Sequence, residues 1–264
     1  MTSLTAAVLL CAGCATSSTD AAPPAAKSSA SSAAEATAVV RSAVRATRTT
    51  SAYTHQKVEV ADGRGTTYRI HVTGGFDLAA DRGDLRVRMP GGPTGSIDEI
   101  FDGDTVYVRG TEDLASETWG ATSRSTAKAH ALLRAPLNDP EFVLQQIATM
   151  RKTTEVGSER VDGARTTHYR GILDRAALVR RTTPKIHDKY DQIVEYTGSQ
   201  VIVFADAWVD DAGRIAQTRT TMNMAGLGMT VTLTLSDHGR RVEAARPSAS
   251  ETVMVPSYEG PMLG

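Results

Sequence analysis

The segment from Val201 to Ser236 reads VIVFADAWVDDAGRIAQTRTTMNMAGLGMTVTLTLS and decides the fold of this chain. Its last part alternates strictly between polar residues and four apolar ones, which are Met229, Val231, Leu233 and Leu235. Such period-two alternation indicates an antiparallel strand with one apolar face and one solvated face. Upstream, Asp-Asp-Ala-Gly at residues 210–213 separates two extended segments and predicts a hairpin turn. The apolar face of the resulting sheet must be covered by other parts of the chain.

Turn signals built from Asp, Arg and Gly recur along the chain and predict further hairpins. The expected strand pairs are 53–61 with 66–73, 74–80 with 83–89, 97–101 with 105–110, and 155–161 with 164–171. Asp102 and Asp104 flank Gly103 in one of these turns, and a calcium loop would need several more oxygen ligands at fixed spacing. We therefore interpret these aspartates as turn residues.

Five helices are expected between and before these strands, at residues 33–48, 126–133, 140–150, 174–181 and 185–196. The third has the strongest start signal, with Asp139 as N-cap and Pro140 at the first helical position. Two of the helices carry apolar stripes at helical spacing. These stripes are Val143, Ile147 and Met150 on one helix, and Ile186, Tyr190 and Ile193 on the other.

Strands dominate, with helices grouped mainly after the first meander, so we expect an α+β domain over residues 33–264 with one large antiparallel sheet. The striped helices are the available covers for the apolar sheet face. If they pack tightly on it, a plain core results; if space remains, the shared residues line a ligand cavity. The cavity candidates from the helices and this strand are Val143, Ile147, Met150, Ile186, Tyr190, Ile193, Val231, Leu233 and Leu235.

A stretch rich in methionine and glycine, residues 222–229, joins two expected strands as a loop. Apart from Asn223 it lacks the polar residues of ordinary turns. Exposed apolar patches often mark binding sites, and methionine adapts to ligands of variable shape. Either this loop contacts a ligand, or it is a glycine-rich turn tucked under a helix. The further candidates from this loop are Met222, Met224, Leu227 and Met229.

Composition excludes several function classes. The chain is 41% hydrophobic and 22% charged with a formal net charge of −1, so nothing suggests a nucleic-acid partner. The six histidines are scattered without metal-ligand spacing on one helix, and no nucleophile elbow or phosphate-binding glycine loop occurs. We therefore expect no catalytic residues, no metal and no cofactor.

The beginning of the chain reads as a targeting region. Residues 4–12 form an apolar run too short to cross a bilayer, followed by Gly13-Cys14, which predicts a signal peptide over residues 1–13. The sequence around Cys14 resembles a bacterial lipobox, although Cys11 stands where leucine is usual and no basic residue precedes the run. The resemblance implies a diacylglyceryl group on Cys14; the other interpretation is an accidental cysteine in a plain signal peptide. Residues 15–32, rich in Ala, Ser, Thr and Pro, are then expected to be a flexible tether.

Four short motifs in the folded body resemble those of actinobacterial lipoproteins of the LppX/LprG type. They are residues 156–163 (VGSERVDG), 166–171 (TTHYRG), 207–214 (AWVD with Gly-Arg) and 237–239 (DHG). The likeness covers roughly residues 33–255. It implies a LolA-like fold, which is a large curved antiparallel β half-barrel with helices packed across its concave face. It further implies an apolar cavity for acyl chains such as palmitate, and no catalytic residues.

The expected function is therefore that of a non-enzymatic envelope lipoprotein. It would sit on the extracytoplasmic face of the cell membrane through its lipid anchor and would bind or carry acyl-chain lipids or lipoproteins between sheet and helices. The alternative is a sensor or interaction protein on the same fold, whose groove binds another envelope protein. Lipid recovered with the chain would favour the first, and a partner recovered by crosslinking would favour the second.

Overall fold

The computed structural model describes residues 25–264 except 92–94, 225, 259 and 261, so the predicted signal peptide and Cys14 lie outside the described residues. Within that part, one sheet has the strand order β12-β6-β5-β4-β3-β2-β1-β11-β10-β9-β8-β7. The first meander comprises β1 (Ser51–Ala61), β2 (Thr67–Asp77), β3 (Arg82–Arg88), β4 (Ile97–Asp102), β5 (Thr105–Arg109) and β6 (Trp119–Ser123). The second comprises β7 (Arg151–Val161), β8 (Ala164–Leu173), β9 (Val203–Asp210), β10 (Ile215–Met224) and β11 (Leu227–Ser236).

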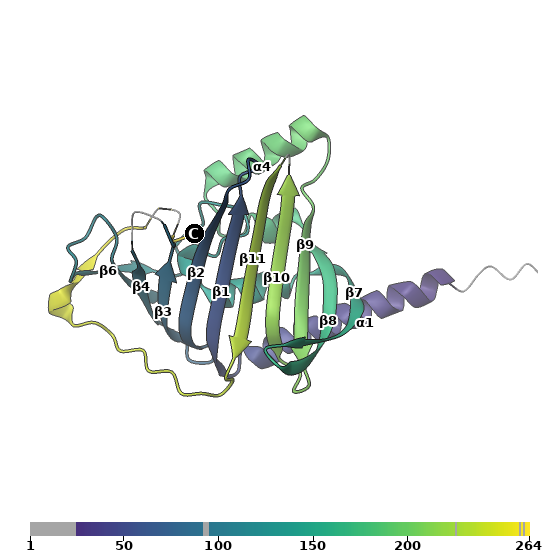
Figure 1. Ribbon diagram of the computed structural model, residues 1–264, viewed down its shortest axis with the longest axis horizontal. Helices are drawn as coiled ribbons and strands as arrows, with labels where there is room; N and C mark the ends of the chain where they lie inside the picture. The colour runs from purple at the N-terminus through teal and green to yellow at the C-terminus, as the bar shows by residue number, and fades with distance from the viewer. Residues whose placement is uncertain (1–24, 92–94, 225, 259, 261) are drawn as a thin grey trace, which may run out of the picture.

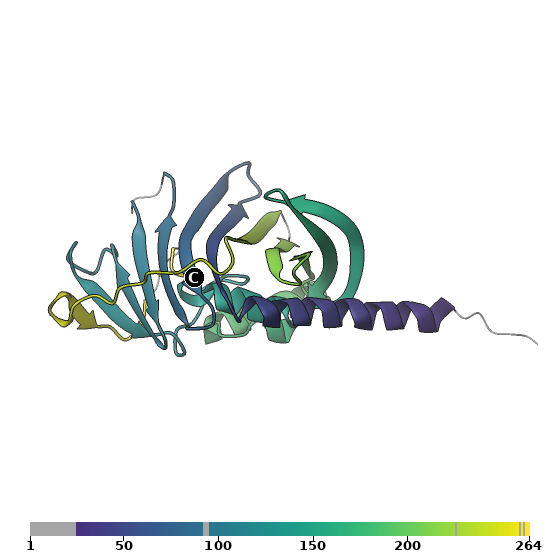
Figure 2. The same ribbon diagram turned by 90° about the horizontal axis from the view of Figure 1, so that it is seen from below.

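All neighbouring pairs are antiparallel except one. The short β12 (Thr252–Met254) lies parallel to β6, after a long segment that returns across the molecule (Figure 1). The two meanders meet at the pairing of β1 with β11, where Val58 lies opposite Val231. Seen from below, the sheet arches over the helices, so the predicted curved antiparallel sheet of an α+β protein is confirmed (Figure 2).

The helices lie on the concave side of this arch (Figures 1 and 2). They are α1 (Ala25–Thr47), α2 (Pro140–Ile147), α3 (Arg175–Leu178) and α4 (Pro184–Thr197), with 3₁₀ turns at Pro136–Asn138 and Ala249–Glu251. Helix α1 packs on β7, β9 and β10 and against α2. No helix in the part of the chain that the structure describes is long and apolar enough to cross a membrane.

Local sequence explains the helix ends. Asp139 accepts a hydrogen bond from the backbone N–H of Glu141, and Pro140 follows at the first helical position, as predicted for α2. Asp174 caps α3 in the same way through the N–H of Ala177. Gly198 ends α4 with φ of 65°, a left-handed conformation that glycine adopts without a steric penalty.

Alternation along the strands places one apolar row after another on the concave face. The row nearest the β10–β11 turn consists of Tyr68, Val60, Met229, Met222 and Val203, which pair across five strands. The next row consists of Ile70, Val58, Val231, Thr220 and Ala205. These rows are the surface over which the helices lie.

Three predictions about individual elements need correction. The helix expected from Ala33 begins at Ala25, so the last part of the predicted tether, residues 25–32, is helical; residues 15–24 lie outside the described part. The segments 66–73 and 74–80 are not two strands, because β2 runs on through Gly74 to Asp77. Gly74 is required there, since a Cβ atom would lie 1.9 Å from the Asp84 carbonyl oxygen on β3.

The third correction concerns residues 126–133, where a helix was predicted and the backbone is irregular. Its hydrogen-bonding groups are taken by another segment. The Ala129 N–H donates to the Arg181 carbonyl at 2.7 Å, and the Ala129 carbonyl accepts from Thr183 at 3.0 Å. Leu133 has φ of 63°, which an α-helix does not allow. The end of this irregular segment, residues 131–134, forms one wall of a cavity that also borders α4 and the sheet.

Candidate functional site

A cavity of about 570 Å³ lies between α4, the irregular segment 131–134 and the β10–β11 end of the concave face. Its volume falls within the roughly 300–1,000 Å³ typical of small-molecule sites. The sheet contributes Val58, Val60, Tyr68, Ile70, Met222, Met224, Leu227 and Met229, and Met89 follows directly after β3. Helix α4 and the irregular segment contribute Ile186, Lys189, Tyr190, Ile193, Ala131, Leu132 and Arg134. The lining is therefore apolar apart from two basic side chains and the hydroxyl of its tyrosines.

The methionine-rich stretch forms the upper end of this cavity, although it is not the loop that the sequence suggested. Met222 and Met224 belong to β10, and Leu227 and Met229 belong to β11, so the hairpin strands continue up to the turn. Met222 lies opposite Met229, and Met224 lies opposite Leu227, which places all four side chains on one face. Met222 and Met229 are buried, whereas Leu227 is 42% exposed at the margin.

Helix α4 covers the cavity with three apolar side chains one turn apart. Ile186 and Tyr190 are buried, and Ile193 is half-buried. Lys189, on the same helix, is exposed and lies at the rim. All three predicted α4 candidates and all four hairpin candidates therefore line one cavity.

The other six candidates lie in the packed core and do not line this cavity. Helix α2 is buried on nearly every side, so its stripe touches protein rather than open space. The six residues are Val143, Ile147, Met150, Val231, Leu233 and Leu235, each less than one-tenth exposed. The sequence predicts them as cavity residues because they lie on an apolar helix stripe or an apolar strand face, but the structure packs them into the core.

Beside the cavity, three buried polar side chains, Arg134, Asn138 and Glu99, connect the irregular segment with β4. Arg134, only 4% exposed, donates from Nη2 to Asn138 Oδ1 at 2.8 Å and to the Met262 carbonyl at 3.2 Å. Asn138 Nδ2 in turn donates to Glu99 Oε1 at 3.0 Å. Glu99 is fully buried, and this burial raises the pKa of its carboxyl group to about 8. Burial also lowers the pKa of Arg134 to about 10, so this guanidinium remains charged at neutral pH.

Sequence reasoning missed Glu99 and Arg134. A signal for Glu99 existed, because it occupies an inward position of β4 between Ile97 and Phe101. A carboxyl group on the buried side of a strand calls for a partner or a function. No comparable signal marked Arg134, since an arginine in an irregular segment is normally solvated.

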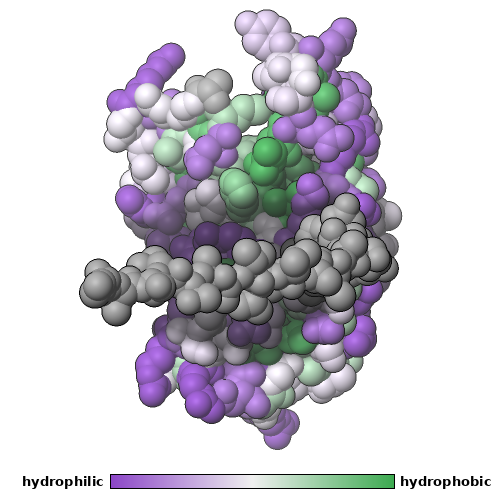
Figure 3. Space-filling view, turned by 90° about the vertical axis from the view of Figure 1, so that its right-hand side faces the viewer, coloured by the Kyte–Doolittle hydropathy of each residue, from purple (hydrophilic) through white to green (hydrophobic). Residues whose placement is uncertain are grey.

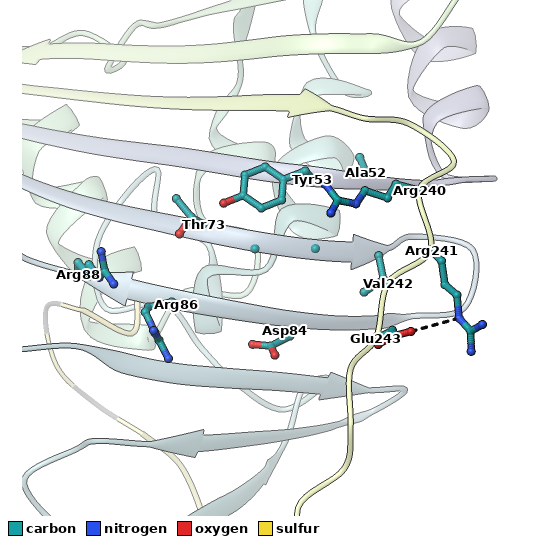
Figure 4. A pocket seen from close by; sticks show the side chains of 12 residues that line it. Ala52, Tyr53, Thr73, Asp84, Arg86, Arg88, Arg240, Arg241, Val242 and Glu243 are labelled. Carbon is teal, nitrogen blue, oxygen red and sulfur yellow. Dashed lines mark ion pairs between the residues drawn. The ribbon is translucent and has the colours of Figure 1, made fainter.

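A second pocket of about 480 Å³ lies on the outer face of β1–β3, beneath the returning segment 240–243 (Figure 4). It is basic, but most of its arginines are paired. Arg86 contacts Asp98 at 2.7 Å, Arg241 contacts Glu243 at 3.8 Å, and Arg240 contacts Asp237 at 3.7 Å. Because these charges are compensated within the chain, this pocket is the weaker candidate.

Alternate residues of the motifs that carried the family resemblance lie on the outer face, among them His168 and Trp208. The His168 ring stacks on Trp208, with Nδ1 2.8 Å from Glu159 Oε1 and Nε2 2.6 Å from Asp206 Oδ1. Trp208 Nε1 donates to Glu159 Oε2 at 3.1 Å. These contacts join β7, β8 and β9, so the motif residues hold strands together and do not reach the cavity.

The side of the molecule near β7 and α1 is shown in Figure 3. Apolar surface gathers above the middle of this side, and hydrophilic residues form its margins. Apolar surface with a polar margin is typical of binding regions.

No family model matches this chain. A curated relative, an uncharacterised 31.2 kDa protein of Streptomyces griseus, is 26% identical over 206 residues. The match covers 73% of this chain, and the chain spans only 65% of that relative's length.

Two of the similar solved structures are mycobacterial. LprF from Mycobacterium bovis is 14% identical, with 82% of this chain and 98% of that chain covered and a TM-score of 0.49. The Mycobacterium tuberculosis lipoprotein LppX is 15% identical, with 80% and 99% covered and a TM-score of 0.43. LppX is thus among the solved structures similar to this chain, and the predicted resemblance to the LppX type is confirmed to that extent.

Proposed function

We propose that this protein binds acyl-chain lipid in the cavity between α4 and the sheet, without enzymatic activity, as a carrier in the cell envelope. The observation that carries the proposal is the cavity itself, which is apolar on the sheet side and on the α4 side. Burying a methylene group in such a site contributes about 0.8 kcal/mol. Four flexible side chains at the hairpin end, three of them methionines, suit a chain that can bend or vary in length.

The test is to titrate a fluorescent fatty-acyl probe into the delipidated full-length chain and into a variant whose cavity is filled. Ala131 lines the cavity and is half-buried, so Ala131→Trp should occupy the space that the acyl chain needs. The matched control is Ala80→Trp, in an exposed turn between β2 and β3. Wild type and the control should bind the probe alike, and Ala131→Trp should bind it at least tenfold more weakly while retaining a cooperative melt.

Absence of probe binding in delipidated wild type would contradict the proposal. Recovery of a crosslinked envelope protein instead of lipid would support the interaction-protein alternative. Native mass spectrometry of the untreated chain gives an independent result, because a bound lipid adds a discrete mass that extraction removes.

The location on the outer side of the cell membrane is part of the same proposal and rests on Cys14. A diacylglyceryl group supplies two acyl chains, which hold a protein on a membrane far better than one. Wild type should therefore fractionate with membranes, and Cys14→Ser should be released or remain unprocessed. Equal fractionation and equal mature mass for both proteins would count against lipidation at this cysteine.

A further inference from the structure

Arg134 has donors that nothing in the described part of the chain uses. Its Nη2 group is satisfied by Asn138 and Met262, but Nε and Nη1 are buried and have no hydrogen-bond partner. A guanidinium carries five N–H donors, and buried donors without a hydrogen-bond acceptor destabilise the folded chain. Arg134 also lines the apolar cavity. An unsatisfied cation in the wall of a hollow apolar site is a feature that a ligand would explain.

The charge of Arg134 also lacks a counter-ion. Among the described residues, no carboxylate lies within ion-pair distance of Arg134. The other arginine buried in the described part of the chain, Arg124, does have a counter-ion, because it contacts Asp139 at 2.8 Å. The acidic group whose charge acts on Arg134 is Glu99, and burial raises the pKa of its carboxyl group to about 8. Glu99 forms no ion pair with Arg134, because Asn138 accepts a hydrogen bond from Arg134 and itself donates to Glu99.

The rest of the lining has the same sign of charge. Two charged residues are among those that line the cavity, Arg134 in the wall and Lys189 at the rim, and both are cations. A purely neutral hydrocarbon ligand would gain nothing from either of them. An unpaired charge next to an apolar space destabilises the folded protein, and an anionic group on the ligand would remove this destabilisation.

We propose that the cavity selects anionic amphiphiles, with the acyl chain against the methionine end and an acidic headgroup, carboxylate or phosphate, hydrogen-bonded to Arg134. This inference rests on the proposed function and specifies its ligand class. Lys189 adds a second, weaker attraction, because it is exposed and its charge is screened by water. The headgroup bonds are charge-assisted, which makes them about twice as strong as bonds between neutral groups.

The experiment compares three ligands with the same sixteen-carbon chain, which are hexadecanoic acid, hexadecyl phosphate and hexadecanol. Each displaces the fluorescent acyl probe from the delipidated full-length chain. For wild type, one or both anions should bind roughly ten- to a hundredfold more tightly than the alcohol. Which anion binds more tightly identifies the headgroup. Inorganic phosphate alone should not displace the probe; displacement by it would overturn the assignment of the anion to an acyl ligand.

Single substitutions test which side chain causes the preference for anions over the alcohol. Arg134→Met should bring the affinity for both anions down to about that for hexadecanol, and Arg134→Gln tests the same point with a neutral residue that can still donate to Asn138. Lys189→Met should reduce the preference only slightly. The matched control is Arg180→Met, an exposed arginine that does not line the cavity, which should behave like wild type.

The two proposals fail in different ways. If wild type binds all three ligands equally, or if Arg134→Gln keeps the anion preference, the headgroup assignment is wrong while acyl binding stands. If none of the three ligands displaces the probe, or the probe does not bind at all, acyl binding itself is wrong.

Discussion

The two halves of the concave face differ, although one continuous sheet builds both. In the packed half, α1 lies directly on β7, β9 and β10, and α2 lies on β9. Val40, Val44 and Leu144 of these helices are almost completely buried. In the hollow half, α4 stands over the β10–β11 end with the cavity of about 570 Å³ beneath it.

The covering helix accounts for this difference. Helix α1 faces the sheet with small residues, Ala36 and Ala43, between its valines, so its backbone can approach closely. Helix α4 buries only Ile186 and Tyr190. Strand alternation thus decides which face is apolar, and the helix above it decides whether that face becomes core or cavity.

The largest effect on stability is expected in the packed half of the concave face. Leu233, 1% exposed, lies in the core and not in the cavity lining, so Leu233→Ala should lower the free energy of unfolding by about 2–5 kcal/mol. Urea denaturation of the delipidated chain measures it. A loss below about 1 kcal/mol would show that this part of the face is also hollow.

The second prediction concerns the buried carboxyl group of Glu99, beside the hollow half, and the pH dependence of stability. The folded chain keeps the Glu99 proton up to about pH 8, whereas the unfolded chain releases it near its ordinary value of 4.5. Between these values the folded state binds more protons, so the free energy of unfolding should fall as pH rises, by on the order of a few kcal/mol. Asn138, Arg134 and Asp139 are the groups that face this carboxyl.

Glu99→Gln removes the ionisable group and retains an acceptor for Asn138. The variant should gain stability over wild type as pH rises from 4.5 to 8, in urea titrations at a series of pH values. Glu243→Gln is the matched control, because Glu243 is highly exposed and should leave the pH dependence unchanged. Parallel curves for wild type and Glu99→Gln would mean that Glu99 is ionised in the folded chain.

The smallest effect on stability should come from the hollow half. Ile193 is half-buried and borders open space, so Ile193→Ala should cost less than about 1.5 kcal/mol in unfolding free energy. The acyl probe should also bind roughly tenfold more weakly to this variant, since apolar contact with the ligand is lost. Melting curves with and without lipid measure both quantities. A large stability loss with unchanged probe affinity would assign Ile193 to the core.

Much of this arrangement could be predicted from the sequence, because it depends on local patterns. The alternation from Met229 to Leu235, the Asp139–Pro140 helix start and the turn at residues 210–213 each specify their own geometry. The division of the apolar face could not be predicted, because it depends on how closely helices distant in sequence approach it. Arg134 likewise gained its position from contacts with Asn138 and Met262, which no local pattern records.

The pairing of β1 with β11 has a consequence for the order of folding. These strands come from opposite ends of the domain, so β1 keeps an open edge until residues 227–236 have been synthesised or have found their place. Pairings between distant segments form slowly, and an open strand edge invites association with other chains. The seam that unites the sheet is therefore also the point at which a half-finished chain is most exposed to aggregation.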